Sequence, residues 1–552
     1  MTAPLVSNKT YQWLFALLGF VYITGLFVPL MDNDAGHHAA IALRMYLTGD
    51  YVNLVDYQGD YIDKPHLFFW TTAVSYHLFG VTSFAYRFPT FLFTIGGIYS
   101  TFRLGKELYD HETGKLAALV AASSFCMMLA CTDVRMDGML SAFIAFATWQ
   151  LVGYVHHQKN IYLAGAALGL ALAFCTKGHV GLVTPVAGLF FYILYLKKWK
   201  LLFNWHWLIE IVLFGIFISP VVYCYYLQFN LHPEKVIKGA RDVNGIKFIL
   251  WSHSFERFGG NRFGSDGSDD KFFFLHTFLW TFAPWCLAAY TAFGKRIKEL
   301  GRRKEEWLST GTFVLIGLLI SFSSFKMPHY LPVLTPAIAV MTARLFVGNR
   351  YNARWRKALY IIQVTATSLL VLLAILVNTW AFPLKNVGVM IGAVFLSGWL
   401  LYLFAIKTID KLQKAICLSV AAIILLFFLL NLNFYPQLLS YQAGKPLADK
   451  TRGIVDPNHV YYYNKCFSFS YDFYSGTFRK EMTDSMQQSG RHFWLMYMRW
   501  QQKNIDSMYF RMGRSFAAPD FEITHLNGSF INPKTRNSNL DEMRMVEVLG
   551  KN

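Results

Sequence analysis

Apolar segments of about 20 residues, the length at which a helix spans a membrane, recur from near the N-terminus to about residue 433. Hydrophobic residues make up 55% of the 552 residues and charged residues only 15%, a balance that excludes an ordinary water-soluble domain. We therefore predict an all-α membrane bundle of about thirteen spanning helices, at 11–30, 88–104, 115–131, 138–156, 161–176, 178–196, 206–228, 272–293, 309–325, 330–347, 357–378, 387–405 and 414–433.

The net charge of +18, from 51 Lys and Arg against 33 Asp and Glu, is gathered in short clusters between the apolar segments. With the N-terminus inside, every cluster falls on the cytoplasmic side, as the positive-inside rule requires. This distribution indicates anionic membrane lipids as partners, and no nucleic acid is needed to explain the charge. The clusters lie at 103–115, 197–200, 295–304, 350–357 and 407–414.

The same topology places the main polar loops on the external face. Segment 66–81 is apolar but short, and counting it as a span would reverse the downstream charge pattern, so we interpret it as a helix lying on the outer leaflet. The first apolar segment is followed by acidic residues and not by a small-residue cleavage site, which predicts a retained signal anchor. The external parts are the loops at 31–87 and 229–271, the turns at 132–137, 177 and 326–329, and the tail from about 440.

The tail differs in character from the rest of the chain. Short strand-like segments at 460–463, 493–498, 521–526 and 543–549 alternate with polar, turn-rich stretches, which predicts a small mixed α/β domain outside the membrane. Cys466 is the one cysteine of the tail, so no disulfide forms within it. We divide the chain into a membrane domain at 1–436, which includes loop 31–87, and an external domain at 437–552.

The first external loop carries two groups of residues suited to chemistry. Asp32 and Asp34 follow the first span directly, and carboxylates at that depth are costly unless they are paired or used. Further along, Tyr61 and Asp63 flank Lys64, a lysine placed to reach a phosphate at the level of the lipid headgroups. The structural alternatives are a solvated helix end for the carboxylates and an ordinary snorkelling lysine for Lys64.

Three later turns repeat this pattern on the same face. Asp133, Arg135 and Asp137 lie between two spans, where a structural pair of Arg135 with Asp133 is the alternative. Cations also interrupt apolar segments at the turns 176–179 and 326–330, and taken singly these are snorkelling lysines. Because external surfaces are poor in Lys and Arg, four such sites on one face favour an anionic ligand.

Together these motifs resemble the GT-C glycosyltransferases that use polyprenyl-phosphate sugars, in the superfamily of the aminoarabinose lipid A transferases and protein O-mannosyltransferases. The resemblance runs in order over about 11–345. Ala35 and His37 stand where many relatives have Glu and Arg, and Asp32 is an addition to the usual pattern. The matching segments are 34–45, 61–65, 79–81, 87–89, Asp137, 176–178, 256–258, 284–285 and 326–330.

The resemblance implies a GT-C bundle with a periplasmic C-terminal domain, and an enzyme that moves a sugar from undecaprenyl or another polyprenyl phosphate with inversion. Asp34 would be the base, and Asp137 a second catalytic acid that orders the acceptor or a nearby cation. The donor phosphate would be bound by cations and phenols that neutralise and orient it. These are Lys64, Arg87, Tyr61, Tyr330, Lys177, Lys326 and Arg257.

Cofactor use follows from the leaving group. A monophosphate can be neutralised by lysines alone, so no metal is required. A divalent ion remains an alternative, held by the mixed oxygen and nitrogen donors Asp63, His253 and His329, and Asp32 with Asp34 also resembles an acidic metal-binding pair.

Two other classes of function compete with the enzyme. A polyprenyl-lipid transporter or flippase would also use intramembrane charges, but it requires polar sites along a path to the cytoplasm. A scaffold protein whose tail binds cell-wall polymers would leave Asp34 and Lys64 dispensable. As an enzyme the chain has lipid A, another glycolipid, a glycan or a protein as acceptor, and the resemblance favours the bacterial inner membrane.

Overall fold

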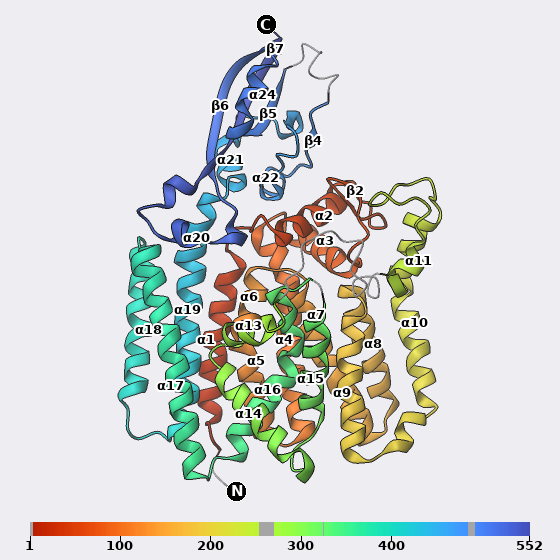
Figure 1. The fold of residues 1–552 in the computed structure, drawn as a ribbon, viewed down its shortest axis with the longest axis vertical. Coiled ribbons are helices and arrows are strands. Elements are labelled where there is room, and N and C mark those ends of the chain that lie inside the picture. Colours follow the sequence, from red (N-terminus) through yellow and green to blue (C-terminus); the bar gives the residue numbers. More distant parts are fainter. Residues whose placement is uncertain (1–3, 253–269, 324, 484–491, 552) are drawn as a thin grey trace.

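The computed structural model describes residues 4–252, 270–323, 325–483 and 492–551. A long bundle of helices carries a small sheet domain at one end, and the N-terminus lies at the opposite end (Figure 1). The first half of the bundle contains α1 (Asn8–Leu26), α2 (Asp34–Thr48), the hairpin β1 (Val55–Asp56) and β2 (Gly59–Asp60), α3 (Leu67–Phe79), α4 (Ser83–Leu108), α5 (His111–Ala122), α6 (Phe125–Thr132), α7 (Asp137–His157), α8 (Asn160–Lys177), α9 (Val180–Leu196) and α10 (His206–Tyr225).

The second half completes the bundle. It contains α11 (Gly245–Lys247), α13 (Phe273–Thr281), α14 (Cys286–Glu299), α15 (Leu308–Ser321), the 3-10 helix η5 (Pro328–Leu334), α16 (Thr335–Gly348), α17 (Ala353–Ile375), α18 (Val387–Ala405) and α19 (Lys411–Leu429). Every segment predicted to span the membrane contains a helix among its described residues, although 115–131 bends by 49° between α5 and α6 and 272–293 is split into α13 and α14.

Seven helices of the described chain are long and apolar enough to cross a membrane, or eight if the bent pair α5–α6 counts as one span. α7 and α19 lie inside the bundle, whereas α10 and α18 expose most of their apolar surface at its periphery. Apolar helices exposed in this way are stable against lipid, because all their backbone bonds are internal. The chain is therefore a multi-pass membrane protein with a GT-C-like bundle and a mixed sheet at its C-terminal end.

The ends of the helices next to the sheet domain are covered by short elements. α2 and α3 lie across the end of the bundle below the sheet domain (Figure 1). α3 corresponds to the segment predicted at 66–81, and it packs against α2 and α4. The loop between α1 and α4 thus forms a layer between the membrane helices and the sheet domain.

The sheet domain has five strands in the order β4-β3-β5-β7-β6, parallel from β4 to β5 and antiparallel at β5–β7 and β7–β6. One predicted strand, 521–526, is wrong: a 3-10 turn occupies it, and the preceding residues form the long edge strand β6 instead. Gly513 lies at a break in the register between Met512 and Ser515, and Pro519 is on an edge strand, the two positions at which a sheet tolerates these residues. The elements are α20 (Tyr435–Leu438), α21 (Gly444–Thr451), β3 (Val460–Tyr462), α22 (Phe469–Ser475), β4 (Lys480–Glu481), β5 (Phe493–Met498), α24 (Gln502–Asp506), β6 (Phe510–Asp520), α25 (Gly528–Ile531) and β7 (Asp541–Lys551).

Two contacts fix the sheet domain to the bundle. The Arg536 guanidinium donates to the backbone carbonyl of Ala381, beyond α17, and its carbon lies 4.1 Å from the centre of the Phe382 ring. The Tyr474 hydroxyl of α22 accepts from the backbone N–H of Leu30, 2.7 Å away, and contacts Ser83 at the start of α4. The domain is therefore attached to the segment after α17 and to both ends of the loop between α1 and α4.

Candidate active site

A cluster of charges from three separate segments lies at the end of the bundle beneath the sheet domain. Arg135, between α6 and α7, donates from Nη1 to the Asp34 carboxylate at 2.9 Å and from Nε to Asp133 at 3.2 Å. The same Nη1 lies 3.3 Å from Nδ1 of His329 in η5. Arg135 therefore joins the first loop, the α6–α7 turn and η5 at one point, so it does more than form the local pair with Asp133.

Asp34 is the first residue of α2. Asn33 caps this helix by accepting from the backbone N–H of Ala35, and its amide donates to Asp133. The partial positive charge at a helix N-terminus stabilises a carboxylate there. With its side chain 54% exposed, Asp34 combines a fixed backbone with a carboxylate that a substrate can reach.

A buried ion pair lies beside this cluster. Lys177, at the end of α8, donates to the carboxylate of Asp137 at the start of α7, with 2.6 Å between Nζ and Oδ1 and side chains 11% and 4% exposed. The Lys177 ammonium also lies 4.9 Å from the centre of the Tyr330 ring. Three residues predicted from separate motifs thus meet in one contact, and Lys177 is paired with a carboxylate and an aromatic face.

Lys64 belongs to the same neighbourhood. Burial in α2 lowers the pKa of His38 well below its usual range, and the positive charges of His37, Lys64, Arg135 and Lys177 lower that pKa further. Lys64, Arg135 and Lys177 thus all lie near enough to α2 to act on this imidazole. They are accompanied by the carboxylates of Asp34, Asp133 and Asp137, so the cluster contains both signs of charge.

Tyr61 lies in the wall of the cluster. Burial, with smaller contributions from Asp63 and Asp34, raises the pKa of this phenol well above its usual range. Its ring meets the His37 ring edge-on, with 5.2 Å between the centres. Tyr61 therefore stays protonated and is able to donate a hydrogen bond to an anion.

The predicted role of Arg87 in binding phosphate is not supported by its position. Its side chain is buried, and its three nitrogens donate to the backbone carbonyls of Thr132 at 2.7 Å, Val28 at 2.5 Å and Pro29 at 3.0 Å. Those carbonyls belong to the segments that lead into Asp34 and Asp133. Arg87 thus holds the two carboxylate-bearing loops together from below, a structural role that its motif alone does not reveal.

Two of the three donors named for the metal alternative make other contacts. Asp63 forms an ion pair with Lys238, 2.6 Å from Oδ1 to Nζ, and His329 is beside Arg135. Within the described ranges, no group of three His, Cys, Asp or Glu side chains is close enough to hold an ion. His253, like the predicted phosphate ligand Arg257, lies outside the described residues.

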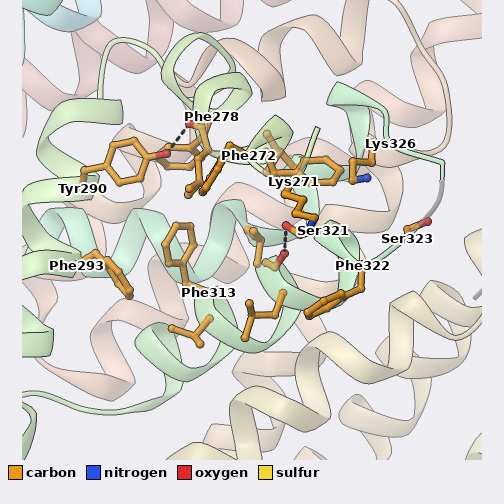
Figure 2. A pocket seen from close by; sticks show the side chains of 17 residues that line it. Lys271, Phe272, Phe278, Tyr290, Phe293, Phe313, Ser321, Phe322, Ser323 and Lys326 are labelled. Atoms are coloured by element: carbon orange, nitrogen blue, oxygen red, sulfur yellow. Dashed lines mark hydrogen bonds between the residues drawn. The ribbon is translucent and has the colours of Figure 1, made fainter. Parts of the chain in front are cut away.

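An apolar pocket of about 780 Å³ opens next to the charged cluster, between α13, α14 and α15 (Figure 2). Phenylalanine side chains line its length, and Lys271 and Lys326 lie together at one end (Figure 2). Phe274 of the wall stacks on Tyr330, with 6.3 Å between ring centres, and Tyr330 in turn contacts Lys177. The wall of an apolar cavity is thus connected to the buried ion pair through Phe274 and Tyr330, a feature that no local motif in the sequence predicts.

The bundle, the charged cluster at its end beneath the sheet domain and the sheet domain itself define a membrane protein of the GT-C fold. Over 98% of both chains it superimposes on ArnT from Cupriavidus metallidurans bound to undecaprenyl phosphate, with a TM-score of 0.72 and 15% sequence identity. The apo state of that protein gives a TM-score of 0.69 at 16% identity, over 91% of this chain and 95% of the other.

Sequence comparisons lead to the same group of proteins. Residues 63–224 match the family described as dolichyl-phosphate-mannose-protein mannosyltransferase. The chain is 25% identical to the undecaprenyl phosphate-alpha-4-amino-4-deoxy-L-arabinose arabinosyl transferase 2 of Pseudomonas fluorescens over 59% of this chain and 58% of the relative. It is 23% identical to the corresponding transferase of Pseudomonas aeruginosa over 70% of both. The match thus spans less than two thirds of the length of the P. fluorescens relative.

Proposed function

We propose that the protein is a membrane glycosyltransferase that moves a sugar from a polyprenyl phosphate to an acceptor at the external face. The observation that carries this proposal is a chain of contacts. The accessible carboxylate of Asp34 pairs with Arg135, which lies beside His329, and the next residue, Tyr330, contacts both Lys177 and Phe274 in the wall of an apolar pocket of about 780 Å³. The pocket suits a polyprenyl chain, the cations suit its phosphate, and the carboxylate suits the acceptor hydroxyl. Undecaprenyl phosphate is the ligand of the structurally similar ArnT, which supports this choice of donor.

The chemistry requires one displacement. Asp34 takes the proton of the acceptor hydroxyl, the acceptor oxygen attacks the anomeric carbon, and the bond from that carbon to the phosphate oxygen breaks. The phosphate leaves with the electron pair, so its extra negative charge must be neutralised as the bond breaks. Attack opposite to the leaving group inverts the anomeric centre.

Arg135 takes a central part in this scheme. In the described state Nη1 of Arg135 donates to Oδ2 of Asp34 and so occupies the oxygen that would take the acceptor proton. The donor is a phosphodiester with one negative charge, and its two free oxygens can make bidentate contact with the Arg135 guanidinium, which gains strength as a second charge develops on the leaving phosphate. Binding of the donor would therefore draw Arg135 away from Asp34 and free the base when substrate is present. Lys64, Lys177, Lys326 and Tyr330 would complete the phosphate site, with Tyr61 as a donor.

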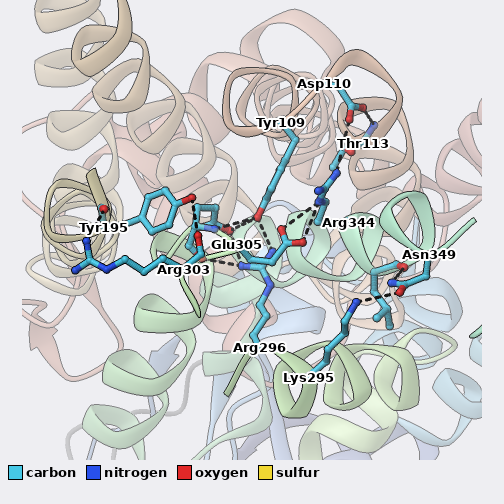
Figure 3. A network of polar contacts seen from close by, with 12 residues as sticks. Tyr109, Asp110, Thr113, Tyr195, Lys295, Arg296, Arg303, Glu305, Arg344 and Asn349 are labelled. Carbon is cyan, nitrogen blue, oxygen red and sulfur yellow. Dashed lines mark hydrogen bonds and ion pairs between the residues drawn. The ribbon is translucent and has the colours of Figure 1, made fainter. Parts of the chain in front are cut away.

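The polyprenyl-lipid transporter is the second candidate, and the opposite end of the bundle argues against it. There Arg296 pairs with Glu306 at 2.7 Å and Arg344 with Glu305 at 3.1 Å, around the Tyr109 side chain (Figure 3). These contacts tie the ends of α4, α14 and α16 together. A transporter must open this end to pass a lipid headgroup, whereas an enzyme working at the external face gains from keeping it closed.

The orientation and the acceptor are part of the proposal. Basic residues at the end that carries the N-terminus, such as Lys115 and Arg350, support a cytoplasmic location for that end. The site would then face the periplasm of a bacterial inner membrane. Lipid A, another glycolipid, a glycan or a protein are the candidate acceptors.

The test uses purified wild-type, Asp34→Asn and Lys64→Ala proteins with radiolabelled polyprenyl-phosphate sugars from host membranes. Asp456→Asn is the matched control, because Asp456 is an exposed carboxylate of the sheet domain bonded to Asn458 and His459. We expect transfer of label by the wild-type and control proteins, with loss in both site variants while the lipid still binds to Asp34→Asn. Full activity in Asp34→Asn would remove Asp34 as the base. Movement of lipid between leaflets without transfer would favour the transporter.

A further inference from the structure

Asp32, two residues before the candidate base, is bound by the sheet domain. Its carboxylate accepts hydrogen bonds from the hydroxyls of Ser468 and Ser470, the latter at 2.8 Å, and from the backbone N–H of Ser470 at 3.2 Å. These donors lie 436 and 438 residues further along the chain. We call this contact the Asp32 clasp: the Asp32 carboxylate with the segment Ser468–Phe469–Ser470.

The clasp bears directly on the first turn of α2. A Cβ added at Gly36 would lie 3.1 Å from Cβ of Phe469 and 3.2 Å from Oδ1 of Asp32, so the two segments approach as closely as a glycine allows. The next residue, His37, stacks on the Phe469 ring with 4.8 Å between centres and 17° between planes. One side of the turn that begins with Asp34 is therefore covered by the sheet domain.

The serine side of the clasp is itself held in place. Arg479, just before β4, donates to the backbone carbonyl of Ser468 at 2.7 Å and pairs with the carboxylate of Asp472 in α22. The Ser468 hydroxyl also accepts from the backbone N–H of Tyr471, capping α22. Contacts within the sheet domain thus fix the positions of both hydroxyls independently of Asp32.

We propose that the Asp32 clasp makes the sheet domain a positioning element of the catalytic centre, by fixing the first turn of α2 so that Asp34 faces the acceptor hydroxyl. This inference rests on the proposed function and assigns a role to the C-terminal domain. Asp34 is held by Arg135 on one side, and the clasp holds its backbone on the other. When Arg135 turns to the donor phosphate, the clasp is what keeps the base in place.

The size of the effect follows from the geometry of proton transfer. A base must lie within hydrogen-bond distance of the proton it takes, and a misplacement of about 1 Å costs on the order of 100-fold in rate. Loss of the clasp loosens the α2 turn without removing a group that contacts the donor. The rate constant for transfer should therefore fall while the affinity for the donor lipid is retained.

The experiment compares Asp32→Ala, Ser468→Ala/Ser470→Ala, the triple variant and the conservative Asp32→Asn with the wild-type protein, with Asp456→Ala as a control for removal of an exposed carboxylate from the sheet domain. We expect kcat to fall about 10- to 100-fold in Asp32→Ala, with the donor KM changed less than threefold. The serine variant should lose as much, the triple variant no more than either, and Asp32→Asn should recover part of the rate because its amide oxygen still accepts.

Hydrogen exchange supplies a second measurement that is independent of activity. Amides of residues 35–38 should exchange faster in Asp32→Ala than in the wild-type protein, and at the wild-type rate in Asp456→Ala. Wild-type kcat in Asp32→Ala, or fully additive losses in the triple variant, would overturn the proposal. If the wild-type protein transfers no sugar, the proposed function fails, and unchanged exchange at 35–38 then removes the clasp as well.

Discussion

Nη1 of Arg135 lies 2.9 Å from the carboxylate of Asp34, a residue 101 positions earlier in the chain. The pair joins the turn before α7 to the first residue of α2. A cation in contact with a catalytic carboxylate either restrains it until substrate arrives or stabilises charge during the reaction, and the two roles predict different kinetics.

Arg135→Gln tests these roles. We expect kcat for sugar transfer to fall about 100-fold, the size found when one donor that stabilises developing charge is removed, together with a higher KM for the lipid donor. Arg135→Lys should retain part of both, since it keeps the charge but loses the bidentate contact. Steady-state kinetics at several donor concentrations separate the two parameters. A faster enzyme after Arg135→Gln would mean that Arg135 only restrains Asp34.

The buried pair of Asp137 with Lys177 makes a prediction about stability. Removing one partner leaves an uncompensated charge at a site where the side chains are 4% and 11% exposed, at a cost of about 3–5 kcal/mol. Asp137→Leu or Lys177→Met alone should therefore lower the thermal unfolding temperature clearly. The double variant should recover most of that loss but stay inactive. A double variant that unfolds as early as the single ones would show that the pair contributes through other contacts.

The apolar pocket is tested by narrowing it. Gly317 of α15 lines the pocket, and a Cβ placed there meets no atom within 4 Å. Gly317→Leu should put a side chain into this space and raise the KM for a long-chain polyprenyl donor about tenfold, equivalent to about 1.4 kcal/mol of binding. Gly215→Leu on α10 is the control, because Gly215 also has open space around it and is not among the residues lining the pocket. Equal increases in the donor KM for both variants would mean that the pocket does not bind the donor.

The sheet domain should respond to pH through Asp520. Burial, with Asp32 and Asp541 nearby, raises the pKa of this carboxyl to about 6, above its value in an unfolded chain. The folded protein then binds the proton more tightly, so the contribution of Asp520 to stability grows as the pH falls from above 6 towards 4 and is lost as it rises. Asp520→Asn keeps an acceptor for the backbone N–H of Ala443 and is the reference variant. The unfolding temperature of the wild-type protein, relative to that of Asp520→Asn, should be higher at pH 5 than at pH 7. Melting curves at both values for both proteins decide this.

Much of the fold follows from the sequence because the length of each apolar segment and the position of each basic cluster are properties of the local sequence. The helices of the bundle fall where the apolar segments predict them. The bend at 115–131 does not, since it depends on Ser123 and Ser124, whose hydroxyls bond to carbonyls of the preceding turn and interrupt the helix. Such competition between side chain and backbone is settled by packing, here by the bond from the N–H of Phe125 to the carbonyl of Ala283.

The candidate site was predictable as a set of residues but not as an arrangement. Lys64, Asp137 and Lys177 are signalled by charge in an apolar setting. Arg87 has the same signal, yet its partners are carbonyls that only the folded loops bring together. Asp32 stood outside the motif because its serine partners lie at the far end of the chain.

The hydrogen bond from Arg536 to Ala381 and the Asp32 clasp attach the sheet domain at separate places, the loop after α17 and the loop before α2. For protein engineering this means that the C-terminal domain is not a module to be exchanged freely at residue 436. A chimera that keeps the membrane bundle but receives another tail would need to import both an arginine for the carbonyl of Ala381 and hydroxyls for Asp32. Recombination between relatives should therefore succeed at this boundary only where the incoming tail supplies both contacts.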